Sequence, residues 1–172
     1  MTARDLEAAA EAARGAGVAV ALVEQPYRVA GRRSAPPSAH LDAAWTTVVS
    51  HLAEGTFRGL ALVVGGRSSG ARVACRTAEA TGAVAVLCLA FPLQPPQGSR
   101  PTAPPSRLAE LDEVAVPTLV VQGDRDPFGT PPEAANRTVV QVAGDHSLRT
   151  DLEAITSAVR SWLDEILRVR TI

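Results

Sequence analysis

Short apolar segments alternate with helical patterns along this chain, and this alternation limits the possible folds more than any other feature. Five segments have the length and composition of buried strands: residues 18–23, 59–64, 83–90, 117–123 and 138–143. Apolar residues recur at helical spacing in four further stretches: 2–14, 39–54, 69–81 and from 150 onwards. Strands that are apolar on both faces and separated by helices are typical of a parallel sheet covered on both sides. The sequence therefore predicts a three-layer α/β/α fold with a mainly parallel sheet of about five strands.

Capping patterns predict where helices begin. Thr followed three residues later by Asp or Glu predicts helix starts at residues 2–5, 130–133 and 150–153. A short helical turn is expected near residues 108–112. The proline-rich run 91–106 is incompatible with a regular helical lid.

Length and composition exclude several classes of protein. The 172 residues fit one domain, expected to span 1–172. Hydrophobic residues make up 46% and the net charge is −1, which is typical of a soluble globular protein and not of a disordered or nucleic-acid-binding one. All 17 basic residues are arginine, so Schiff-base chemistry and general-base chemistry by lysine are excluded.

Cysteine and histidine spacing gives no sign of a metal or another cofactor, and we expect none. Cys75 and Cys88 lack metal-type spacing and are interpreted as buried small hydrophobic residues. His40 and His51 flank a helical pattern well before the glycine-rich segment described next, and are interpreted as surface or core residues. The first 17 residues lack a signal-peptide core and no apolar run is long enough for a bilayer, so a cytoplasmic location is expected.

The segment Gly66-Arg67-Ser68-Ser69-Gly70 follows the second predicted strand and precedes a predicted helix. This is the context of the G-x-S-x-G turn that projects a nucleophilic serine above a sheet. The flanking glycines would avoid collisions in that turn, and the N–H of Ser69 would face an oxyanion at the start of the helix. The alternative interpretation is a glycine-rich turn in which Ser68 or Ser69 caps the helix.

A serine nucleophile needs a base, and the base needs an orienting carboxylate. His146 follows the fifth predicted strand and therefore lies at the same carboxyl edge of the sheet as Ser68. Asp124 and Asp126 follow the fourth strand, and the Pro-Phe-Gly turn after Asp126 favours that residue. Asp145 is interpreted as a capping or ion-pairing residue. The order serine, aspartate, histidine along the chain is the order of the α/β-hydrolase fold.

The segments "GGRSSGARVA", "PTLVVQGDRDPFG" and "GDHSL" together resemble the α/β-hydrolase superfamily. They resemble most its dienelactone-hydrolase-like branch, which includes testis-expressed protein 30 and the NSL-complex subunit-3-like proteins. "FPL" before the proline-rich run and "PYR" after the first strand also fit that branch. The resemblance covers nearly the whole chain and implies Ser68 as nucleophile, Asp126 as acid and His146 as base.

One departure from the family concerns its H-G-x-G loop, which donates a second N–H to the oxyanion and has no counterpart here. The resemblance implies that the strand before this loop lies between the strands that match residues 18–23 and 59–64. Either the gene start lies upstream, or the protein is shortened. Because unpaired buried backbone groups are costly, we expect the two flanking strands to pair directly, or another chain or an upstream segment to fill the gap.

Two functions from different classes remain open at this point. The first is a serine hydrolase that acts on a small-molecule ester or related acyl bond, with Tyr27, Arg28 and Arg67 as weaker candidates for substrate contact. For Arg67 the alternative is an ion pair with a nearby acid. The second is a non-catalytic hydrolase-like domain for protein association. Nucleic-acid and membrane partners are not expected, and a homodimer through an exposed strand edge is a further expectation.

Overall fold

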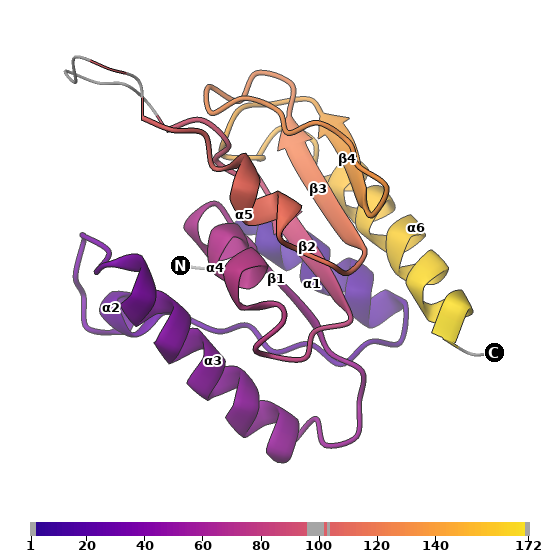
Figure 1. Cartoon of the computed structure of the whole chain (residues 1–172). Coiled ribbons are helices and arrows are strands. Elements are labelled where there is room, and N and C mark those ends of the chain that lie inside the picture. Colours follow the sequence, from indigo (N-terminus) through magenta and orange to yellow (C-terminus); the bar gives the residue numbers. More distant parts are fainter. Residues whose placement is uncertain (1–2, 96–101, 103, 171–172) are drawn as a thin grey trace.

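The sheet has four parallel strands in the computed structural model, which describes residues 3–95, 102 and 104–170 (Figure 1). The strands are β1 (Val63–Arg67), β2 (Ala85–Leu89), β3 (Thr118–Gly123) and β4 (Arg137–Val142). They lie side by side in the order of the sequence, and every neighbouring pair is parallel. All four carboxyl ends therefore meet at one edge, where ligand sites of open parallel sheets form.

Helices cover both faces of this sheet. α1 (Arg4–Gly15) and α6 (Leu152–Arg170) pack together on one face, where their apolar residues meet inward-facing side chains such as Leu119 and Val121. On the other face, α4 (Ser69–Thr77) and α5 (Leu108–Asp112) meet Val86 and Val120, and α3 (Ser38–Glu54) packs on α4. A short helix, α2 (Pro26–Val29), precedes α3. The predicted parallel α/β class is confirmed.

Three of the predicted strands match β2, β3 and β4 to within two residues at each end. The strand predicted at 59–64 begins later, as β1, because pairing with β2 starts only at Val63. The strand predicted at 18–23 is wrong: these residues form no strand, and among the described residues the sheet has four strands in place of about five. An apolar sequence becomes a strand only where a neighbouring backbone can share its hydrogen bonds.

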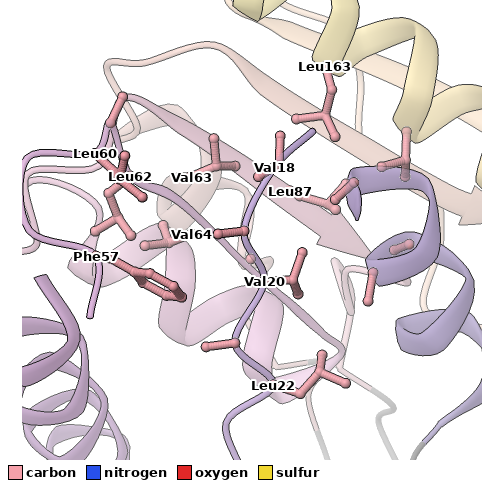
Figure 2. Close-up of a pocket in the computed structure, with 18 of the residues that line it drawn as sticks. Val18, Val20, Leu22, Phe57, Leu60, Leu62, Val63, Val64, Leu87 and Leu163 are labelled. Atoms are coloured by element: carbon pink, nitrogen blue, oxygen red, sulfur yellow. The ribbon is translucent and has the colours of Figure 1, made fainter. Parts of the chain in front are cut away.

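The segment 18–23 does not pair with β1, so the expectation of direct pairing is wrong. A cavity of about 390 Å³ lies between them, lined by residues 17–23, by β1 and the residues before it, and by apolar side chains from the covering helices (Figure 2). Val18 and Val20 lie on one wall, and Leu62 and Val63 lie on the other. Leu22 and Leu60, which also line it, are 49% and 60% exposed. That another chain or a further segment occupies this place stays a prediction.

The capping patterns predicted helix starts less well than the apolar patterns predicted strands. Residues 130–133 form no helix, because Ala134 and Arg137 exchange backbone hydrogen bonds in a turn that leads directly into β4. At the start of α6 the cap is Asp151, whose Oδ1 accepts from the N–H of Ala154, and not Thr150. Asp5 lies inside the first turn of α1 and is buried, while its expected partner Thr2 lies outside the described residues.

The remaining expectations concern the cysteines, the proline-rich run and membrane spans. Cys75 and Cys88 are buried, unbridged and 3.5 Å apart at sulfur. The contact with Cys75, together with burial, raises the pKa of the Cys88 thiol. The run 91–106 forms no helix where it is described, and residues 96–101 and 103 of it lie outside the described part. Within the described part of the chain, we find no helix with the length and hydropathy that crossing a membrane requires.

Candidate functional site

Ser68 lies in a strained turn between β1 and α4. Its backbone has φ 53° and ψ −112°, a conformation that residues other than glycine rarely adopt. Its N–H still donates to the carbonyl of Leu89 at the end of β2, so the neighbouring strand holds the backbone of Ser68 in place. Ser68 holds the capping position of α4, but its side chain makes no capping hydrogen bond. The geometry therefore does not support a helix-capping role for the Ser68 hydroxyl.

The two glycines that flank the serine have different steric roles. A Cβ on Gly66 would come within 2.4 Å of the carbonyl carbon of Gly70, so β1 and α4 can approach only because residue 66 has no side chain. A Cβ on Gly70 would meet no atom within 4 Å. The expectation that both glycines avoid collisions is thus supported for Gly66 and is wrong for Gly70.

This difference predicts a large loss of stability in one of two matched alanine variants and little change in the other. Gly66→Ala is expected to lower the free energy of unfolding by about 3 kcal/mol, because backbone would have to move. Gly70→Ala is expected to stay within about 1 kcal/mol of the wild type, since alanine favours a helix and meets open space. Urea unfolding of the two variants measures this, and equal losses in both would contradict the steric assignment.

His146 follows β4 in a tight loop and contacts both of the residues expected to be its partners. Its Nε2 lies 2.8 Å from Oγ of Ser68, and its Nδ1 lies 2.8 Å from Oδ2 of Asp126. The His146 side chain is 21% exposed, whereas the Asp126 side chain is fully covered. A covered carboxylate, a partly exposed imidazole and a hydroxyl thus form one continuous chain of hydrogen-bonding contacts.

The turn that follows Asp126 fixes the direction of its carboxylate. Oδ1 accepts a hydrogen bond of 2.9 Å from the N–H of Phe128, and Oδ2 accepts one of 2.8 Å from Nε2 of Gln122. The Gly129 N–H closes the turn on the Asp126 carbonyl. Each carboxylate oxygen therefore has a donor from the protein, and Oδ2 is shared between Gln122 and His146.

The alternative acids lie elsewhere. Asp124 is exposed, and its Oδ1 accepts from the N–H of Gly144. Asp145 accepts from the hydroxyl and the N–H of Ser147, and these hydrogen bonds lower the pKa of its carboxyl. Of the three aspartates near the loop, only Asp126 has a hydrogen-bonding contact with the imidazole among the described residues.

Sequence analysis missed two residues that support this arrangement. Gln122 is fully buried and donates to Asp126, to the Phe91 carbonyl and to the Gly129 carbonyl. The ring of Phe128 lies against that of His146, with centroids 4.4 Å apart. A polar side chain at the end of the apolar run "TLVV" was the available signal for Gln122. Phe128 gave no such signal, because its ring contact depends on the loop after β4.

Of the weaker site candidates, some contact the loops that carry the serine and the histidine, and others do not. Ser69 is the first residue of α4, where a backbone N–H has no partner within the helix. Arg67 pairs with Asp5 and donates to the main-chain carbonyl of His146. Tyr27 and Arg28 lie in α2 and contact each other, with the guanidinium 5.5 Å from the ring centroid. Within the described residues, neither of these two has a hydrogen bond or ring contact with Ser68, His146 or Asp126.

Comparison with known proteins agrees with this architecture. Residues 1–166 match the family model described as an alpha/beta hydrolase domain. An alpha-beta serine hydrolase homologue from Coxiella burnetii is 16% identical with a TM-score of 0.68, over 95% of this chain and 77% of that one. Est1E from Butyrivibrio proteoclasticus is 19% identical with a TM-score of 0.74, over 96% and 82%.

A serine hydrolase without a lid from Xanthomonas campestris is also similar, at 19% identity and a TM-score of 0.68, over 96% of this chain and 75% of that one. These identities show a shared fold. A sequence comparison with curated proteins finds no match. The resemblance to one particular branch of the fold family stays a prediction.

Proposed function

This chain belongs to the α/β-hydrolase family, and from that premise we propose that it is a serine hydrolase that cleaves an ester or related acyl bond. Ser68 is the nucleophile, His146 the base and Asp126 the acid. The observation that carries the proposal is the pair of 2.8 Å contacts from the two His146 nitrogens to Ser68 Oγ and Asp126 Oδ2. A structural histidine does not require a strained serine on one side and a covered carboxylate on the other.

The proposed reaction has two halves. Oγ of Ser68 attacks the acyl carbon while its proton passes to Nε2 of His146, and Asp126 stabilises the resulting imidazolium through Nδ1. His146 then returns the proton to the leaving oxygen, and the acyl group remains on Ser68. In the second half water attacks the acyl-enzyme, with His146 again as base, and the acid product leaves.

The N–H of Ser69, at the positive end of α4, is the proposed donor to the oxyanion of the tetrahedral intermediate. We assign no second donor, because no residue of this chain corresponds to the H-G-x-G loop.

A fluorophosphonate probe tests this proposal, since it forms a covalent bond only with an activated serine. We expect stoichiometric labelling of the folded protein, with the adduct located on Ser68 by peptide mass spectrometry. Ser147 is half-buried, directly follows His146 in the sequence and hydrogen-bonds to Asp145. Ser147→Ala therefore provides a matched control that should label normally. Absence of labelling in folded protein, or an adduct at another serine, would overturn the proposal.

A second candidate function is a hydrolase-like domain that associates with another chain and does no chemistry. The observation that favours it is the apolar cavity beside the uncovered edge of β1 (Figure 2). Large apolar surfaces beside an unpaired strand edge are typical of association sites. The same probe separates the candidates, since a domain without catalysis is folded but is not labelled.

A further inference from the structure

Arg67 and Asp5 form an ion pair beside the candidate site. Nε of Arg67 lies 2.7 Å from Oδ2 of Asp5, whose side chain is 1% exposed. Nη2 of the same guanidinium donates a 2.8 Å hydrogen bond to the main-chain carbonyl of His146. One side chain therefore joins the first turn of α1 to the end of β1 and to the loop that carries the imidazole.

Stability alone explains this ion pair poorly. Burial raises the pKa of the Asp5 carboxyl, and the charge of Arg67 opposes that rise. Although the two atoms lie within ion-pair distance, neither makes a well-aligned hydrogen bond. α1 is already anchored by buried alanines that pack against α6 and the sheet. Because an apolar pair of similar size often stabilises a protein as well as a buried ion pair does, another role for the charges is worth seeking.

The loop after β4, which carries His146, is held in place by several contacts. Its far end is fixed by Leu148, which is buried, has φ 48° and donates its N–H to the Asp145 carbonyl. Its near end is fixed at Gly144, whose N–H donates to Asp124 Oδ1. Between the two ends, Arg67 donates a hydrogen bond to the His146 carbonyl. Since Arg67 directly precedes Ser68, the same residue is tied to both partners of the contact between Oγ and Nε2.

We propose that Arg67 is a positioning residue, held in place by Asp5, that keeps His146 at the distance at which Nε2 reaches Oγ of Ser68. A guanidinium suits this task because it is planar and always charged, so Nε can lie beside the carboxylate while Nη2 donates to the carbonyl. The inference rests on the proposed function, since the contact that it maintains is the one used for proton transfer. The ion pair with Asp5 confirms the expectation that Arg67 pairs with a nearby acid, and a contact between Arg67 and substrate stays a prediction.

The double variant Asp5→Leu/Arg67→Met tests the proposal without leaving an unpaired buried charge. We expect the melting temperature to be unchanged or higher. Turnover of p-nitrophenyl acetate should fall about 10- to 100-fold, because a shift of the base by about 1 Å has an effect of this size. KM should stay within about two-fold, since substrate binding is not the step affected.

A control removes another ion pair, whose arginine is about as exposed as Arg67 (22% against 27%) and whose acid is less buried than Asp5 (18% against 1%). Its acid, Glu110, also contacts Arg76, which keeps its pair with Asp42 in the control. Arg72 and Glu110 join α4 to α5 through contacts of 2.8 and 2.5 Å, away from His146. Arg72→Met/Glu110→Leu is expected to leave turnover unchanged. Arg67→Lys keeps the charge beside Asp5 but lacks the planar guanidinium. Its melting temperature should therefore equal that of the wild type, while its turnover should lie between those of the wild type and the double variant. If the double variant has a lowered melting temperature, Arg67→Lys alone tests the positioning role of Arg67.

Nuclear magnetic resonance gives a readout that does not depend on catalysis. The ¹H and ¹⁵N shifts of the His146 ring report its hydrogen bonds to Asp126 and Ser68. We expect them to change in Asp5→Leu/Arg67→Met and to be preserved in the control. If the wild type neither hydrolyses esters nor reacts with fluorophosphonate, the proposed function fails and these shifts alone decide the positioning role. A folded double variant with unchanged ring shifts would overturn the inference, and so would unchanged turnover in an active enzyme.

Discussion

Replacing Ser68 with alanine is expected to lower the turnover of p-nitrophenyl acetate by at least about 10³-fold, because the reaction loses its nucleophile. The fold should persist, since Oγ makes its hydrogen-bonding contact with His146 and none that caps α4. Ester hydrolysis and thermal unfolding, measured on the same preparation, check both statements. Activity that survives in folded Ser68→Ala would contradict the assignment of the nucleophile.

A glycine at the same position gives a sharper control. Ser68 has φ 53°, which glycine adopts with little strain and alanine does not. Ser68→Gly should therefore be as inactive as Ser68→Ala but more stable than it, by about 1 kcal/mol. If glycine brings no gain in the unfolding free energy over alanine, the turn at residue 68 is not strained as described.

Asp126→Asn is expected to lower turnover by about 10⁴-fold, the size of effect seen when the acid of such a triad becomes an amide. Oδ1 accepts from the Phe128 N–H, so the amide oxygen of the new side chain is held at that position. The amide NH₂ then faces Nδ1 of His146 and Nε2 of Gln122. Because two donors cannot pair, His146 must accept at Nδ1 and carry its proton on Nε2. In this tautomer it cannot take the proton of Ser68.

Asp124→Asn provides the comparison, since it alters a neighbouring carboxylate on the same loop. Its Oδ1 accepts from the Gly144 N–H, a role that an amide oxygen fills equally well. We expect turnover within about three-fold of the wild type, as for a surface change away from the reacting groups. If Asp124→Asn lowers turnover more than Asp126→Asn does, the assignment of the acid is wrong.

The parallel fold could be predicted because its evidence is local. Runs such as "TLVVQG" and "TVVQV" are short, apolar and bounded by turns, and each pairs on one or both sides in the sheet. Parallel strands place all of their carboxyl ends at one edge. Ser68, Asp126 and His146 each follow a strand, so the sequence indicated their common edge, and the structure brings them to hydrogen-bonding distance.

The segment 18–23 shows where local evidence fails. Its composition is that of a strand, yet it lies across a cavity from β1 and shares no ladder with it. Strand formation needs a backbone neighbour at about 4.8 Å, and no pattern within six residues can report whether that neighbour is present. The capping pattern at residues 130–133 failed for a related reason, since β4 begins too soon for a helix to form.

The sequence by itself determined the parallel α/β class, the tight glycine-flanked turn at Ser68, and the loops on which Asp126 and His146 lie. These depend on apolar period, on glycine and on chain order, which are properties of neighbouring residues. Tertiary structure alone decided that Asp5 reaches Arg67, that Arg67 reaches the His146 carbonyl, and that Gln122 supports Asp126. The contacts of Arg67 with Asp5 and with His146 join residues far apart in the chain, so they form only once helices and strands have packed. The contact of Gln122 with Asp126 depends on the turn after β3.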